Sequence, residues 1–531
     1  MRRSSLVLVA TSLAAFTATL DNTVVAVALR DMQKDLGSGV TGLQGIVTAY
    51  TVALAALLLA GGALVDVLGA KRVLLAGLVV FAAASAACAS ATSVTALVGC
   101  RAVQGAGAAL LLPGGLAVLA AAYPEGARRR RAVGTWAATG GTALVAGPVA
   151  GGFLVAHQGW ESVFWVNVPL CALVALVVLP TPAVTPAQRR RLDVPGAVGS
   201  CLVLGLATYA VVLAGRHGLS LTVGLCTAGA VTAAVATTAA ERRTTEPLVP
   251  AGLLRDRRFT GAALGAFAAS LAVFVLLVFV SLFLQLVQEH DAQQAGLVLL
   301  PLPAALVVTA VLAGRWHAVA LPVLVGLALA ATALIVLGAR LKEGTSDGEL
   351  RLLMGIVGAG VGLTTAPVVT ASLSSAGDAR AGLAAATLNV SRELGGVVAV
   401  AGLGALAVAQ LSRELTATLT RGQVPAGKQP EVLDALLGAR TDEVRNLLLH
   451  DIGVVKTLRL NQTLKDAATA SFLSSTRLIL ISAGAVLLVA AAGSGWLLRP
   501  PLVRPPLPRA RGRRSGRARQ GRSPAAPRGP G

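Results

Sequence analysis

The chain has 531 residues, of which 55% are hydrophobic and 13% are charged, and its mean hydropathy is +0.75. Soluble domains carry about twice that share of charged residues, so this composition excludes a soluble protein and indicates a membrane protein. The net charge of +21 would favour a nucleic-acid partner in a soluble chain, but in a membrane protein basic residues first mark the cytoplasmic side.

Apolar runs of about 20 residues, long enough to cross a bilayer as helices, recur fourteen times. The first half holds six of them, at 6–29, 44–65, 73–91, 95–122, 132–155 and 163–179. A central pair follows at 194–215 and 221–240. Six more lie at 261–286, 294–313, 321–339, 352–375, 387–410 and 475–498. We therefore predict an all-α membrane protein with fourteen transmembrane helices.

The first run has two interpretations. Arg2 and Arg3 before it and a small-residue stretch at 26–28 are also typical of a cleaved signal peptide. The run is too long for a signal core, contains Asp21 and is followed at once by further spans. These features favour an uncleaved first helix.

Lys and Arg residues are concentrated in every second connection between the predicted spans. With a cytoplasmic amino terminus, the inner connections hold Lys71, Arg72, Arg128 to Arg131, Arg189 to Arg191, Arg242, Arg243, Arg255, Arg257, Arg258, Arg315 and Arg380. The short outer connections hold only Arg30, Lys34, Arg216, Arg340, Lys342 and Arg351. This bias and the even number of spans predict a multi-pass protein with both termini cytoplasmic. Abundant Ala, Gly, Val and Arg indicate a GC-rich bacterium, in which we expect the protein in the plasma membrane.

Two long polar segments flank the last span. Residues 411–474 balance acids and bases and have leucine at helical spacing in 432–449, which predicts an extracellular loop with an amphipathic helix. The stretch 422–429 resembles a phosphate loop but ends in Gln429 and follows no strand, so we attribute it to chance.

The tail 499–531 has ten arginines and no acid, and should be disordered on anionic lipid. It has no aromatic residue to stack bases, so we expect no nucleic acid partner.

No pattern of an enzyme is present. The sequence contains neither H-E-x-x-H nor G-x-S-x-G. Its five cysteines lie in apolar runs without C-x-x-C spacing, which indicates neither a disulfide framework nor a metal site. We expect no enzyme activity, no metal and no cofactor. The cysteines are Cys88, Cys100, Cys171, Cys201 and Cys226.

Charged residues inside predicted spans are the best functional candidates, because a charge in hydrocarbon is expensive. At about 1.5 Å per residue, Asp21 lies ~12 Å and Arg101 ~9 Å below the outer face. We therefore expect the two to approach each other, and their pair to break or become protonated when access changes. The alternative is a static pair that only permits insertion. Arg392 and Glu393 fall near the inner end of their span, where snorkelling to water would account for them.

Two glycine-containing stretches are candidates for moving surfaces. The inner loop contains Gly62, Asp66, Gly69, Lys71 and Arg72. Asp66 and Lys71 could form a latch by hydrogen bonding to helix ends. A simple surface turn is the alternative. In 140–152, two helical stripes of small residues would form a groove with a bend at Pro148. A packing groove between fixed helices is the alternative there. The stripes are Gly140, Gly147 and Gly151, and Gly141, Pro148 and Gly152.

These stretches together resemble the major facilitator superfamily, and within it the fourteen-span drug:proton antiporters of the EmrB/QacA type. The matching residues are Leu20-Asp21-Asn22-Thr23-Val24-Val25-x-Val27-Ala28-Leu29, Gly62-x-Leu64-x-Asp66-x-x-Gly69-x-Lys71-Arg72, Arg101-x-x-Gln104-Gly105-x-Gly107, Gly147-Pro148-x-x-Gly151-Gly152, Gly159-Trp160 and Val166-Asn167-Val168-Pro169. The sequence departs from the pattern at Val67 and Ala70 in the loop and at Ala26 and Arg30 in the first span.

The resemblance implies two six-helix bundles around a central cavity, with 194–240 as two additional helices. It implies domains at 1–180, 181–258 and 259–498, the last with the loop 411–474, and a tail at 499–531. It also implies proton-driven drug efflux by alternating access, with Arg101 tied to proton coupling. Drug or antibiotic export is the predicted function. The alternative is a proton-coupled importer or exporter of an endogenous metabolite on the same fold, and the glycine motif at 141–152 argues against import. A non-transporting receptor is a further alternative.

The expected substrate follows from the scarcity of acids in the second half. The run 294–313 is uncharged, and aromatic residues make up only 3% of the chain, which leaves little to bind lipophilic cations. We predict neutral or weakly charged lipophilic substrates. The other expected partners are protons and membrane lipids, with the chain acting as a monomer.

Overall fold

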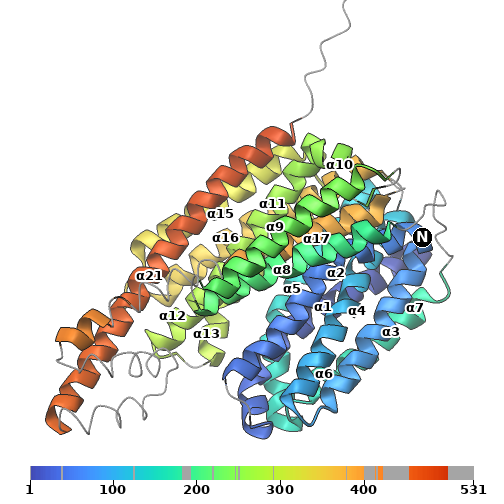
Figure 1. Ribbon diagram of the computed structural model, residues 1–531. Helices are drawn as coiled ribbons and strands as arrows, with labels where there is room; N and C mark the ends of the chain where they lie inside the picture. The colour runs from blue at the N-terminus through green and yellow to red at the C-terminus, as the bar shows by residue number, and fades with distance from the viewer. Residues whose placement is uncertain are drawn as a thin grey trace, which may run out of the picture. The chain divides into compact units, whose positions relative to one another are not determined.

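The computed structural model describes residues 2–499 except 38–39, 124–125, 182–192, 218–219, 245–246, 249–250, 291, 378–379, 400–412, 414–415 and 422–453. These residues form helices joined by short connections, without a strand in the described ranges (Figure 1). The expected all-α class is confirmed. The predicted amphipathic helix at 432–449, the stretch 422–429 and the tail from residue 500 lie outside the described residues.

The first half begins with five long helices, α1 to α5. Ser93 starts the fourth by accepting a hydrogen bond from the backbone N–H of Ala96, and Gly69 separates the second and third at φ 92°, a value that favours glycine. The helices are α1 (Arg2–Asp35), α2 (Val40–Leu68), α3 (Ala70–Ala89), α4 (Val94–Ala122), α5 (Ala127–Gln158), α6 (Ser162–Trp165) and α7 (Asn167–Val178).

The remaining helices follow in chain order. They are α8 (Val194–His217), α9 (Leu221–Glu241), α10 (Ala251–Arg255), α11 (Arg257–Val275), the π-helical η1 (Leu276–Val280), α12 (Ser281–Leu286), α13 (Ala292–Leu299), α14 (Pro301–Ala313), α15 (Ala320–Arg340), α16 (Asp347–Ala376), α17 (Ala381–Val397) and α21 (Val454–Leu497). Eleven helices in the described residues are long and apolar enough to cross a membrane. Each of the fourteen expected ranges overlaps a helix, and the number fourteen stays a prediction.

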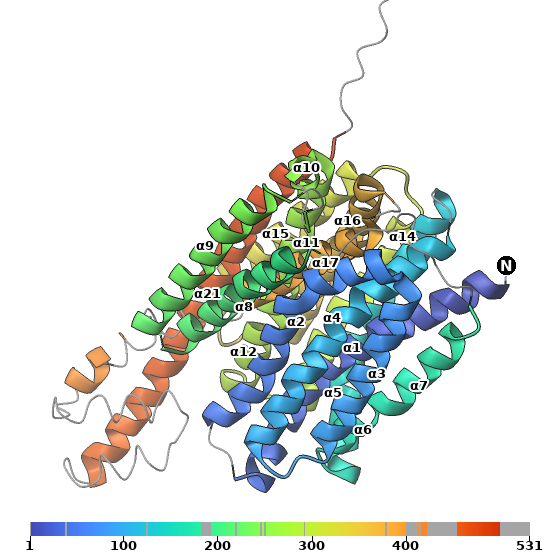
Figure 2. The ribbon, with the colours of Figure 1, turned by 45° about the vertical axis from the view of Figure 1, so that its right-hand side comes forward.

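The expected range 294–313 is one candidate span, Gln294–Ala313, made of α13 and α14. Leu300, between the two helices, keeps α-helical φ and ψ of −53° and −38°, and Pro301 takes the first position of α14. α21 begins at Val454 and runs for 44 residues, so the last part of 411–474 is helical, while the apolar candidate span in α21 begins at Thr469. The expected extracellular loop stays a prediction. No glycine or proline interrupts 454–474, so nothing in the sequence stops the helix there. This part of α21 projects past neighbouring helices in Figures 1 and 2.

The long helices pack in two groups within the compact unit Met1–Arg499. In the first group α4 packs against α1, α2 and α3, and α1 packs against α5. In the second, α16 packs against α11, α14 and α15, while α21 packs against α11 and α15. The groups meet where α17 contacts α2 and α4 and where α5 contacts α14 (Figure 2). The expected domain boundaries inside this unit stay predictions.

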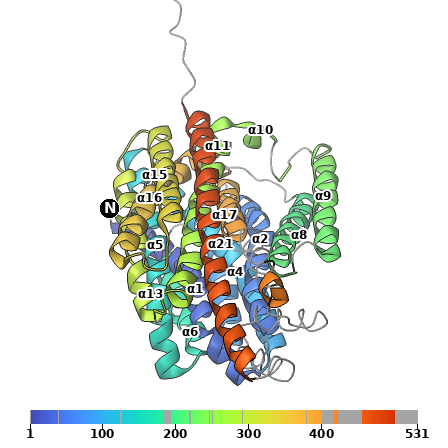
Figure 3. The ribbon, with the colours of Figure 1, turned by 90° about the vertical axis from the view of Figure 1, so that its left-hand side faces the viewer.

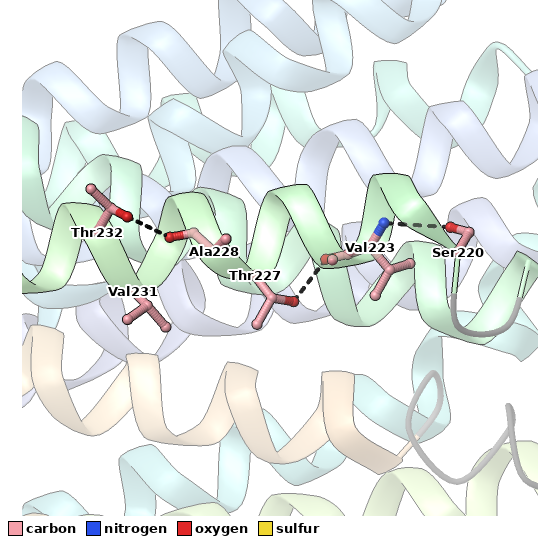
Figure 4. A pocket seen from close by; sticks show the side chains of 7 residues that line it. Ser220, Val223, Thr227, Ala228, Val231 and Thr232 are labelled. Atoms are coloured by element: carbon pink, nitrogen blue, oxygen red, sulfur yellow. Dashed lines mark hydrogen bonds between the residues drawn. The ribbon is translucent and has the colours of Figure 1, made fainter.

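The hairpin of α8 and α9 lies at the side of the molecule, beside α2 (Figure 3). Only 11% of the apolar window of α9 is buried, so this helix presents most of its surface outward. A hollow along α9 is lined by Val223, Thr227, Val231 and their neighbours on that one helix (Figure 4). A hollow on a single outward-facing helix has the character of a lipid contact rather than of a functional site.

Candidate functional site

An ion pair buried between α1 and α4 forms the centre of the site. Arg101 Nη1 donates a hydrogen bond to Asp21 Oδ2 at 2.6 Å, and each residue is only 1% exposed. The structure thus brings together the two charges that the sequence placed at matching depth. A buried pair of this kind is tolerable only when further hydrogen bonds satisfy its remaining donors and acceptors.

Polar side chains from three helices provide those hydrogen bonds. Asp21 Oδ1 accepts from Gln104 Nε2 at 2.8 Å and from Asn167 Nδ2 at 2.7 Å. Arg101 Nη1 also donates to Gln104 Oε1 at 2.8 Å. The hydroxyl of Ser85 accepts from Asn167 at 3.0 Å and donates to the carbonyl of Phe164 at 2.8 Å. The Asp21 carboxylate is therefore held by three donors.

Sequence reasoning did not give Ser85 and Asn167 a role. Each is a single polar side chain inside an otherwise apolar run, Ser85 in α3 and Asn167 at the start of α7. Because buried polar groups need partners, such isolated residues are the available signal for a network. Their relation to Asp21, far away in the chain, appears only in the folded protein.

Aromatic rings enclose the guanidinium of Arg101. Its Cζ lies 4.2 Å from the ring centroid of Tyr50 and 5.8 Å from that of Phe164. Tyr50 OH donates to the carbonyl of Ala18 at 3.4 Å, which fixes the ring between α1 and α2. Tyr50 lines the central cavity, so this ring separates the ion pair from the cavity.

The central cavity has a volume of about 200 Å³ and lies between the two groups of helices. Its walls come from α1, α2, α4 and α5 on one side and from α11, α14, α16 and α17 on the other. Most of the wall is apolar. Its larger polar side chains are Asn22, Tyr50, Trp136, Asn389, Arg392 and Glu393.

A second polar contact joins the two groups of helices at one end of the cavity. Asp66, near the end of α2, accepts hydrogen bonds from the backbone N–H groups of Gly382 at 2.8 Å and Leu383 at 3.1 Å. These are free N–H groups of the first turn of α17, where the helix dipole favours a negative charge. We call this contact the Asp66 latch.

Close backbone approaches accompany the Asp66 latch. A Cβ added to Gly62 would lie 2.7 Å from the carbonyl oxygen of Gly382, and one added to Gly134 of α5 would lie 2.8 Å from that of Ala310 in α14. Both distances are too short for a real side chain. The two groups of helices thus meet through glycine at two seams, α2 with α17 and α5 with α14.

The rest of the loop motif acts within the first group. Lys71 Nζ donates to the carbonyls of Leu179 at 2.7 Å and Thr181 at 2.5 Å, past the end of α7. A cation is favoured at a helix carboxyl terminus. Arg72 is exposed, and Gly69 provides the positive φ of the turn.

Comparison with protein families agrees with this arrangement of two helix groups around a cavity. The family described as Major Facilitator Superfamily matches residues 11–400. The chain belongs to the major facilitator superfamily. Members of this superfamily are membrane transporters and not enzymes.

Individual members of the superfamily are similar over most of the chain. The multidrug resistance protein Stp of Mycobacterium tuberculosis is 32% identical over 508 residues, covering 94% of this chain and 93% of the relative. The tetracenomycin C resistance and export protein of Streptomyces glaucescens is 32% identical over 483 residues, covering 89% and 88%. The proton:xylose symporter XylE, at 13% identity and a TM-score of 0.59 over 93% of this chain and 96% of its own, shares the fold.

The glycine motif of this superfamily member faces two different helices. A Cβ on Gly147 would collide with Thr23 of α1, and one on Gly151 would lie 3.4 Å from Val24. A Cβ on Gly141 would instead lie 2.5 Å from Cδ2 of Leu306 in α14.

The expected pair of continuous small-residue stripes is therefore wrong in part. Within the part of the chain that the structure describes, an added Cβ on Gly140 or Gly152 would meet no atom within 4 Å, so these two glycines make no close packing contact there. α5 runs as one helix from Ala127 to Gln158, and the expected bend at Pro148 stays a prediction.

The expectation for Arg392 and Glu393 is also wrong. Both line the central cavity, about three turns into α17, rather than reaching water at a helix end. The reason is that α17 begins at Ala381, six residues before the apolar run that defined the expected span. The second half thus contributes one acid and one base to the cavity wall, while α14 contributes no charge, as its sequence indicates.

Proposed function

We propose that this transporter is a proton-coupled antiporter that exports lipophilic drugs or antibiotics across the plasma membrane of a bacterium by alternating access. The observation that carries the proposal is the buried Asp21–Arg101 pair, separated from the central cavity by the ring of Tyr50. Export is supported by relatives named for multidrug resistance and for tetracenomycin C resistance and export.

Asp21 is the proposed proton-accepting group. When its carboxylate is neutralised, Arg101 loses its counter-ion in a site that is 1% exposed, and an unpaired buried charge is strongly destabilising. The protein then lowers its free energy by rearranging around Arg101. If the proton favours one of the two arrangements of the helices and the substrate favours the other, binding of each changes the affinity for the other through this conformational equilibrium.

The Asp66 latch and the two glycine seams are the proposed cytoplasmic gate. With both termini cytoplasmic, as the charge distribution predicts, they lie at the inner end of the cavity. Opening to the cytoplasm then requires loss of the two hydrogen bonds to α17 and separation of α5 from α14. The motif with Gly141, Gly147, Pro148, Gly151 and Gly152 would provide the surface on which α5 moves.

The proposed substrates are neutral or weakly charged lipophilic molecules. The mainly apolar cavity wall and its single acid and single base among the described residues support this class. Bis-cationic dyes should therefore be exported poorly. The protein is proposed to work as a monomer, with protons and membrane lipids as its other partners and without a cofactor.

Efflux measurements test the proposal. In a sensitive host that expresses the chain, a chemically varied panel of antibiotics should be exported, and a proton uncoupler should abolish export. Asp21→Asn and Arg101→Ala should lose export at normal surface expression. Retained export by these variants would reject the role of the pair, and accumulation down the proton gradient in vesicles would identify an importer.

A further inference from the structure

Two hydrogen-bond donors in the cavity wall have no acceptor. The indole Nε1 of Trp136 and the Nη2 of Arg392 are buried and make no hydrogen bond with any residue that the structure describes. Trp136 is only 4% exposed, and both side chains line the central cavity. Neither donor belongs to the Asp21 network or to the Asp66 latch.

Other polar groups of the wall are already used. The hydroxyl of Thr365 donates to the carbonyl of Val361 at 2.8 Å, and the amide of Asn389 donates to that of Ala385 at 2.9 Å. Thr19 likewise donates to Ala15 at 2.9 Å. Among the buried donors of the wall that the structure describes, Trp136 Nε1 and Arg392 Nη2 are therefore the ones without an acceptor.

The two donors come from opposite groups of helices. Trp136 lies on α5 and Arg392 on α17, and the guanidinium Cζ lies 5.9 Å from the indole ring centroid. Glu393 is the acid that follows Arg392 on the same wall, whereas Asp21 is fully engaged behind Tyr50. A ligand that bonds to both Trp136 and Arg392 would contact both halves of the transporter.

A buried donor without an acceptor costs about 1–3 kcal/mol, and a charged donor costs more. A substrate atom that accepts from both donors removes this cost, while a substrate without an acceptor leaves it in place. The strongest acceptors for an indole N–H and a guanidinium are carbonyl, carboxylate and phenolate oxygens.

We propose that Trp136 and Arg392 form a subsite that binds an acceptor oxygen of the lipophilic substrate. This inference rests on the proposed export function and specifies its substrate class: apolar molecules that carry a carbonyl, carboxylate or phenolate oxygen. Because the subsite joins α5 and α17, substrate in this position favours the arrangement in which these helices are close.

Export kinetics with two probes test the subsite. Puromycin carries an amide carbonyl oxygen, whereas tetraphenylphosphonium is lipophilic and has no oxygen. In everted vesicles from cells that express the full chain, export appears as accumulation of substrate inside the vesicle. These vesicles should accumulate puromycin, or another oxygen-bearing antibiotic of the panel, and should not accumulate tetraphenylphosphonium. Trp136→Phe and Arg392→Gln should each raise KM for the oxygen-bearing substrate about 10-fold, the effect of ~1.4 kcal/mol, with a smaller change in kcat.

Matched variants control for damage to the fold. Trp165→Phe and Arg340→Gln make the same chemical changes at exposed positions outside the cavity, and should leave KM unchanged. Arg392→Lys, which keeps one charged donor, should restore part of the loss. Unchanged KM in Trp136→Phe and Arg392→Gln, or export of tetraphenylphosphonium equal to that of puromycin, would overturn the subsite. Absence of all gradient-driven export in the wild type would instead reject the export function itself.

Discussion

Asp66 caps a helix that lies in the other half of the molecule. Its Oδ1 accepts a hydrogen bond of 2.8 Å from the backbone N–H of Gly382, which follows 316 residues later in the chain. A second bond to Leu383 makes the contact bidentate. One carboxylate thus joins α2 to α17. Its removal should change the ratio of the closed to the open conformation of the proposed cytoplasmic gate.

Asp66→Ala is expected to open the seam between α2 and α17. Loss of an acid from a helix N-cap costs ~1 kcal/mol, and 1–2 kcal/mol changes a two-state ratio by roughly 5–30-fold. Spin labels placed on α2 and α17 should report a larger population of long distances, and export should slow. Glu349→Gln, which changes an acid paired with Arg340 elsewhere, should leave the distances unchanged. Identical distance distributions in Asp66→Ala and wild type would contradict a gating role.

Gly147→Ala is expected to destabilise the packing of α5 on α1. The new Cβ would collide with Thr23, and overpacking of this kind typically costs about 1–3 kcal/mol. Gly152→Ala adds the same methyl group where no atom lies within 4 Å, so it should be neutral or slightly stabilising. Thermal unfolding of the two purified variants should therefore give a lower Tm for Gly147→Ala alone. Equal Tm values would show that α5 adapts freely at this position.

Removing one partner of the buried ion pair should be worse than removing both. Asp21→Asn leaves Arg101 charged and without its counter-ion, at a cost of about 3–5 kcal/mol. Adding Arg101→Leu to Asp21→Asn should recover part of the stability, while proton-driven export stays absent. A double-mutant cycle on thermal unfolding measures this coupling. Additive effects of the two substitutions would indicate that the pair contributes no interaction of its own.

Both chain ends are expected on the cytoplasmic side. An epitope tag added after Gly531 should be protected from external protease in intact cells, and a tag inserted within 422–453 should be cleaved. The physical reason is the concentration of Lys and Arg in alternate connections. Cleavage of the carboxyl-terminal tag in sealed cells would reverse the orientation or change the number of spans.

The sequence by itself determined the kind of protein and the position of most helices. Apolar runs of spanning length need no tertiary information, because each helix satisfies its own backbone hydrogen bonds in a membrane. Asp21 and Arg101 stood out for a similar reason, since each is a charge in an otherwise apolar run and requires a partner. Glycine placement likewise indicated where backbones approach, as at Gly62 and Gly147.

Helix ends and breaks depended on more than apolarity. α17 begins at Ala381 and α21 at Val454, each before the range expected for its span. In α21 the helix continues into polar sequence before residue 475, which a search for apolar runs does not find. In α17 the added turn at 381–386 consists of Ala, Gly and Leu and is itself apolar. This difference moved Arg392 and Glu393 from an expected helix end to the cavity.

Only the tertiary structure decided which distant groups meet. Ser85 and Asn167 join Asp21, and Gly382 receives Asp66, because separate helices pack side by side at particular rotations. The tertiary structure also decided that the donors of Trp136 and Arg392 lack acceptors, because this requires knowing which side chains lie next to them. Hydrophobic periodicity in the sequence assigns a residue to a helix and to one face of that helix. Which side chain it contacts on another helix depends on how the whole bundle packs.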